Sequence, residues 1–111
     1  IGPQILMPRF PVVVLPNARG KVELTELMRE LARRDINEVH VEAGFKLNGS
    51  LLGDGLVDEL LIYLAPCILG DSACGMFELP ELADLERKRL VQFADMQTIG
   101  SDLRILARVL N

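Results

Sequence analysis

Residues 38–52 read EVHVEAGFKLNGSLL, and this stretch contains the change of pattern that decides the predicted fold. Over residues 38–42 valines alternate with polar side chains, which is the two-residue period of a β-strand. Beyond Gly44 the apolar residues Leu47, Leu51 and Leu52 recur at the spacing of one helix face. The stretch therefore predicts a strand that turns directly into a helix through Ala43 and Gly44.

A strand-to-helix elbow of this kind can bind an anion. The first turn of a helix has backbone N–H groups without intrahelical partners and carries the positive end of the helix dipole. Because Ala43 and Gly44 have almost no side chain, a phosphate can approach the backbone, with Glu42 projecting beside it. The alternative is a tight loop whose glycine only lets helix and sheet pack together.

The residues before the elbow predict a strand and a helix. Residues 12–15 are a continuous apolar run closed by a proline, as in a buried strand, and Arg19 lies in the turn that follows, where a solvated role is favoured over a phosphate contact. Residues 24–31 place four apolar side chains at helical spacing, with ion pairs expected from Glu26 and Glu30 to arginines one turn later. Strand, helix and strand in this order predict a right-handed crossover with residues 12–15 and 38–42 parallel.

The residues after the elbow predict a further strand over residues 56–65, a long loop over residues 67–85 and a C-terminal hairpin. The two hairpin strands, residues 88–99 and 103–110, are joined by Gly100-Ser101-Asp102. The hairpin has more apolar surface than a solvated edge, which favours an interface. The predicted fold class is α/β.

Composition narrows the possible functions. The 111 residues suffice for one domain, and the formal charge of −4 lacks the basic excess of a nucleic-acid binder. No apolar run approaches the roughly 20 residues that cross a bilayer. Cys67 and Cys74 are read as free thiols of a reducing, cytoplasmic compartment, and with a single histidine, His40, no zinc site is expected. His40 has no catalytic partner visible in the sequence and is read as a packed or surface residue.

Several motifs together resemble one enzyme family. They are VEAG at residues 41–44, LNGSLL at residues 47–52, GLVDEL at residues 55–60, YLAP at residues 63–66 and LG at residues 69–70. Their order and spacing are similar to the reductase domain of the bifunctional riboflavin-biosynthesis deaminase/reductase. Many members have a second glycine where this chain has Ala43. The resemblance covers residues 12 to 111.

The resemblance implies a fold, an activity and a site. The fold is that of dihydrofolate reductase, with parallel strands, crossover helices and the antiparallel hairpin. The activity is reduction of a phosphoribosylamino-pyrimidine with NADPH. By the same resemblance, Glu42 is expected to contact the substrate sugar, and the cofactor is expected to be held by Ala43, Gly44, Phe45, Lys46 and Leu47.

The resemblance also implies finer features of the chain. It suggests a cis peptide bond between Ala43 and Gly44, a position beside the nicotinamide for residues 69–73, a structural role for the Asp58-Glu59 pair, and a homodimer.

The chain is expected to be part of a domain. It begins with Ile1, and family members carry a deaminase domain and the first half of the reductase domain upstream. Residues 1–11 are predicted to be extended or irregular and residues 12–111 to be the C-terminal part of the reductase domain, so this chain by itself is expected to be inactive. Two alternatives remain open: a non-catalytic α/β dimerisation module, and a dihydrofolate reductase-type enzyme.

Overall fold

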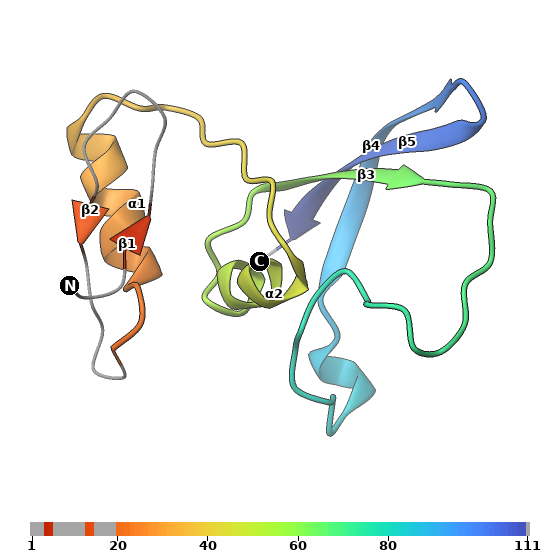
Figure 1. Ribbon diagram of the computed structural model, residues 1–111, viewed down its shortest axis with the longest axis horizontal. Coiled ribbons are helices and arrows are strands. Elements are labelled where there is room, and N and C mark those ends of the chain that lie inside the picture. The colour runs from red at the N-terminus through yellow and green to blue at the C-terminus, as the bar shows by residue number, and fades with distance from the viewer. Residues whose placement is uncertain (1–3, 6–12, 15–19, 111) are drawn as a thin grey trace. The chain divides into compact units, whose positions relative to one another are not determined.

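The computed structural model describes residues 4–5, 13–14 and 20–110, and the chain divides into two compact units, Ile1–Glu42 and Ala43–Asn111 (Figure 1). The division falls at Ala43, inside the predicted elbow.

The first unit contains the short strands β1 (Gln4–Ile5) and β2 (Val13–Val14) and the helix α1 (Leu24–Arg33). The two strands pair antiparallel, with Ile5 opposite Val13. The extended backbone predicted for residues 1–11 is therefore found at Gln4–Ile5, with a strand pairing that the sequence did not predict. The strand predicted over residues 12–15 is found at Val13–Val14, whereas its two ends and Arg19 lie outside the described part of the chain.

Helix α1 forms because one of its faces is apolar and both of its ends are capped. Leu24, Leu27 and Leu31 are buried, as their spacing predicts. The side chain of Glu23 accepts a hydrogen bond from the Thr25 N–H at the first turn. At the other end Asp35 adopts a positive φ of 61°, and the Ile36 N–H donates a hydrogen bond to the Leu31 carbonyl at 3.1 Å.

The ion pairs predicted on the outer face of α1 are confirmed. Glu26 pairs with Arg29, and the Glu30 carboxylate lies 2.9 Å from Arg33 and 3.2 Å from Arg34. These hydrogen bonds, that from Arg33 first, hold the pKa of Glu30 below its ordinary value.

The predicted parallel crossover is wrong for the described residues. Residues 38–42 form no strand, and β2 pairs with β1 rather than with them. The side chains do alternate as predicted, but alternation supplies no hydrogen-bonding neighbour, and a strand exists only where its backbone N–H and C=O groups meet those of another strand. Val39 and Val41 are accordingly 43% and 40% exposed.

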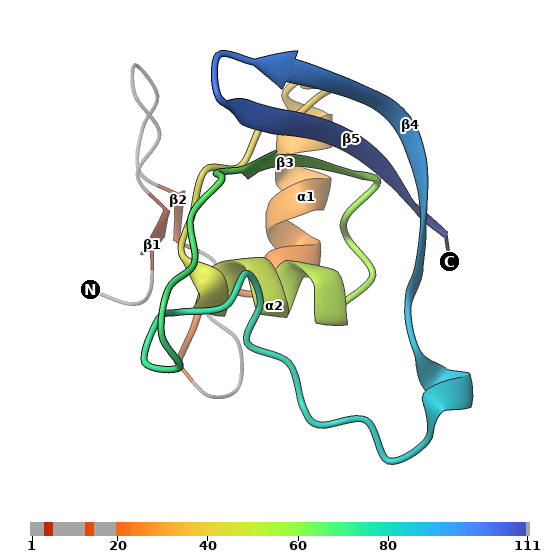
Figure 2. The same ribbon diagram turned by 90° about the vertical axis from the view of Figure 1, so that its right-hand side faces the viewer.

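The second unit contains α2 (Phe45–Gly53), β3 (Glu59–Leu64), the 3-10 helix η1 (Leu85–Arg87), β4 (Leu90–Ile99) and β5 (Asp102–Leu110). The strands form one antiparallel sheet in the order β3-β5-β4. Helix α2 lies across one face of this sheet (Figure 2). The core consists of Leu51 and Leu52 from the helix and Ala107 and Val109 from β5.

The predicted C-terminal hairpin is confirmed. β4 and β5 pair from Ile99 opposite Asp102 to Leu90 opposite Leu110, with an irregularity between Phe93 and Asp95. Gly100 adopts a positive φ of 61° in the connecting turn. The hairpin therefore forms from local sequence signals.

The strand predicted over residues 56–65 is present but shorter, since β3 spans only Glu59–Leu64. The preceding residues end α2: Gly55 has a φ of 71°, and the Leu56 N–H donates to the Leu51 carbonyl at 3.0 Å. Asp58 contributes its carbonyl to the Val109 N–H at 2.9 Å, which fits the structural role expected for the Asp58-Glu59 pair.

We expect the stability of α1 to fall at acid pH. A carboxylate whose folded pKa lies below its ordinary value of 4.5 stabilises the fold above that pH, and this contribution is lost as the pH falls through the lower, folded pKa. Thermal unfolding of the protein followed by circular dichroism across this pH range should show the loss, and Glu30→Gln should reduce it. The control variant Glu38→Gln, which removes a carboxylate outside α1, should keep the full pH dependence; equal profiles for both variants would contradict the assignment.

Candidate functional site

The helix predicted after Gly44 is present, but the predicted cis peptide bond is not. Gly44 is the N-cap residue, with φ −78° and ψ 174°, and α2 begins at Phe45. The described residues contain no cis peptide bond, so the cis bond expected between Ala43 and Gly44 is wrong. The extended conformation of Gly44 brings the chain into the helix with a trans bond, which is the lower-energy isomer for a residue that does not precede proline.

The N-terminus of α2 offers backbone N–H groups to a ligand. The first hydrogen bond within the helix runs from the Asn48 N–H to the Gly44 carbonyl at 3.1 Å. The N–H groups of Phe45, Lys46 and Leu47 therefore have no carbonyl acceptor within the helix. No side chain caps them at Gly44. A Cβ built on Gly44 meets no atom of the described residues within 4 Å. This geometry fits an anionic group such as a phosphate.

The charge of Lys46 adds to this preference. Its side chain is exposed in the first turn of α2. The lysine ammonium group and the positive end of the helix dipole repel each other, but each attracts an anion bound at the N-terminus. The first turn of α2 therefore combines N–H groups, dipole and a lysine.

Glu42 is the last residue of the first unit. Its side chain is 89% exposed, and its carboxylate lies 3.9 Å from the imidazole of His40. Both side chains project to the same side of the extended segment, as predicted, and His40 is a surface residue. The Glu42 carboxylate is thus accessible to a ligand.

Asn48 and Gly49 join α2 to the long loop, and sequence reasoning missed both roles. The Asn48 side-chain amide donates to the carbonyls of Ala43 at 3.3 Å and Met76 at 3.4 Å. The Glu78 N–H donates to the Phe45 carbonyl at 2.9 Å. A Cβ at Gly49 would collide with the Glu78 backbone. The available signal was the pair Asn48-Gly49 inside a helix, since both residues are poor helix formers.

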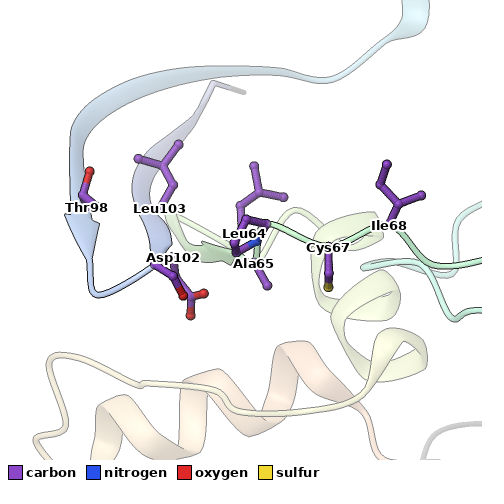
Figure 3. A pocket seen from close by; sticks show the side chains of 9 residues that line it. Leu64, Ala65, Cys67, Ile68, Thr98, Asp102 and Leu103 are labelled. Carbon is purple, nitrogen blue, oxygen red and sulfur yellow. The ribbon is translucent and has the colours of Figure 1, made fainter.

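A separate open hollow of about 500 Å³ lies where β3 ends, beside the β4–β5 turn (Figure 3). It is lined by Leu64, Ala65, Pro66, Cys67, Ile68, Thr98, Ser101, Asp102 and Leu103. None of the predicted site residues lines it. Residues 69–73, expected near the nicotinamide, follow it in the chain and are exposed.

Other candidate chemistry is sparse in the described part of the chain. No group of three or more potential metal ligands occurs there. Cys67 and Cys74 are exposed free thiols. Among the described residues, no helix has the length and apolar character needed to cross a bilayer.

Taken together, the second unit is an α/β unit whose helix N-terminus can receive an anionic ligand. The family model described as RibD C-terminal domain matches residues 4–105, and the chain belongs to this family.

Three known proteins illustrate the similarity. "Riboflavin biosynthesis protein RibD" of Haemophilus influenzae is 50% identical over 82 residues, which are 74% of this chain and 22% of that protein. "5-amino-6-(5-phosphoribosylamino)uracil reductase" of Buchnera aphidicola subsp. Acyrthosiphon pisum is 36% identical over 86 residues, 78% of this chain and 42% of that protein. The structure of Acinetobacter baumannii RibD, form 2, matches with a TM-score of 0.74 and 29% identity, over 81% of this chain and 26% of that one. The chain thus spans less than half the length of these relatives.

We expect Gly49→Ala to destabilise the protein by about 1 kcal/mol or more, because the clash with the Glu78 backbone outweighs the gain in helix propensity. Chemical denaturation measures the free energy of unfolding. Gly53→Ala is the matched control: its Cβ would meet only Leu79 Cδ2 at 3.9 Å, so it should be neutral or slightly stabilising. A stable Gly49→Ala variant would show that the loop does not need this close approach.

Proposed function

We propose that this chain is the C-terminal part of an NADPH-dependent reductase domain that acts on 5-amino-6-(5-phosphoribosylamino)uracil in riboflavin biosynthesis. The observation that carries the proposal is the first turn of α2, with its uncapped N–H groups and open Gly44, in a chain of the RibD C-terminal domain family. The proposed reaction is the one for which the Buchnera relative is named.

The proposed cofactor site consists of Ala43, Gly44, Phe45, Lys46 and Leu47. Bound NADPH supplies the hydride that reduces C1′ of the ribosylamino group and opens the sugar to a ribityl chain. The chain's own contribution is to hold the diphosphate with backbone N–H groups and with the charge of Lys46.

Glu42 is proposed to hydrogen-bond the substrate sugar. Its exposed carboxylate can accept hydrogen bonds from hydroxyl groups. Such bonds align the reacting carbon with the hydride donor, and alignment is the main task of the protein in hydride transfer.

The proposed fold of the whole domain is that of dihydrofolate reductase, with residues 12–111 forming its C-terminal part. Residues 38–42 are then a strand of the mixed sheet, paired with segments outside this chain. The exposure of Val39 and Val41 supports this, since a sheet would cover them. Because the chain spans about a quarter of its longer relatives, we expect it to be inactive by itself.

A homodimer through the hairpin is proposed as the assembled form. Val91, Phe93 and Met96 of β4 lie on the face that carries the buried Ala107 and Val109, yet they are 42%, 62% and 57% exposed. A second copy covering this apolar face would remove it from water. The exposed thiols are in keeping with a reducing compartment, and the cytoplasm is the proposed location.

Two other functions are separated from this one by a single experiment. NADPH is titrated into the full-length protein, and its binding is followed by fluorescence. Then the pyrimidine substrate, 5-amino-6-(5-phosphoribosylamino)uracil, or dihydrofolate is added. Oxidation of NADPH by the pyrimidine supports the proposal, oxidation by dihydrofolate supports a dihydrofolate reductase, and absence of NADPH binding supports a non-catalytic module.

Glu42→Gln is expected to lower turnover by roughly tenfold to a hundredfold, because a charge-assisted hydrogen bond to the substrate is lost. Steady-state kinetics of NADPH oxidation measure the effect, and the thermal unfolding midpoint should stay unchanged. Glu38→Gln serves as the control and should retain full turnover. Full activity of Glu42→Gln would remove Glu42 from the site.

Phe93→Glu is expected to shift the protein from dimer to monomer, because it places a charge in the proposed apolar interface. Sedimentation velocity measures the oligomeric state. Gln92→Glu, which adds a charge at the neighbouring residue on the opposite face of β4, should leave the dimer intact. A dimer that persists in Phe93→Glu would place the interface elsewhere.

A further inference from the structure

We propose that Asn48 is a positioning residue of the cofactor site: it sets the direction of the Gly44 N–H and fastens the loop around Met76 to the same turn. The inference rests on the proposed function, because it assumes that the diphosphate of the cofactor lies at the N-terminus of α2.

One peptide group connects Asn48 to the Gly44 N–H. The Asn48 side chain holds the Ala43 carbonyl at 3.3 Å. This carbonyl and the Gly44 N–H belong to one planar, trans peptide unit, so they point in opposite directions. Fixing the carbonyl therefore also fixes the N–H, which points away from Asn48.

Asn48 also contacts the loop around Met76. An asparagine amide has two donor hydrogens, and the second acceptor here is the Met76 carbonyl at 3.4 Å. The Glu78 N–H adds a bond to the Phe45 carbonyl at 2.9 Å. The same side chain thus holds both the turn that leads into α2 and the loop beside it.

Asparagine is an unfavourable residue at this position of the helix. Asn48 is the fourth residue of α2, beyond the N-cap position where asparagine stabilises a helix by capping. Within a helix asparagine is less favourable than alanine or leucine. Its two side-chain hydrogen bonds account for its presence.

The test uses Asn48→Leu in the full-length protein, since leucine is similar in size and has no donor. We expect the Kd and KM for NADPH to rise about tenfold, the effect of a lost hydrogen bond, while kcat changes less than about twofold. Hydrogen exchange at the Glu78 N–H should become faster. Ser50→Ala, an exposed position on the same helix, is the matched control and should change none of these quantities.

Each outcome decides the inference. An unchanged Kd for NADPH in Asn48→Leu overturns it, and so does a proportional loss of kcat, affinity for both substrates and thermal stability, which indicates a structural role alone. If Asn48→Leu does not fold, Asn48→Ala replaces it with the same expected results. Failure of the unmodified protein to bind NADPH instead refutes the proposed function, and with it this inference.

Discussion

The second unit depends on the close approach between the loop around Glu78 and helix α2. Gly49 permits this approach because a side chain there would occupy the position of the Glu78 backbone. Two hydrogen bonds, from Asn48 to Met76 and from Glu78 to Phe45, hold the loop in place. The loop therefore has a fixed attachment beside the helix N-terminus, although it contains little regular secondary structure.

The first turn of α2 is not capped by a side chain. Side chains that cap a helix would satisfy its N–H groups and leave less for a ligand. Here Gly44 provides no capping oxygen, and the next residues leave their N–H groups available. The Asn48 side chain donates to the Ala43 carbonyl, so it occupies none of these N–H groups.

Two segments of the described part of the chain expose apolar side chains. Residues 38–42 have the alternation of a strand without a partner among the described residues, and β4 has an apolar face without a cover there. Both features leave apolar surface in water, which is unfavourable. Pairing of the first with other strands, and association of the second with another copy, would each remove this cost.

The sequence by itself determined the elements whose signals are local: α1 with its buried leucines and ion pairs, and the hairpin with its turn at Gly100. It also determined the family, through the order of its motifs. Only the tertiary structure decided the roles of Asn48 and Gly49, the trans bond after Ala43 and the unpaired state of residues 38–42 within the described part of the chain. These depend on which backbone groups distant in the chain come together, and side-chain periodicity carries no information about that.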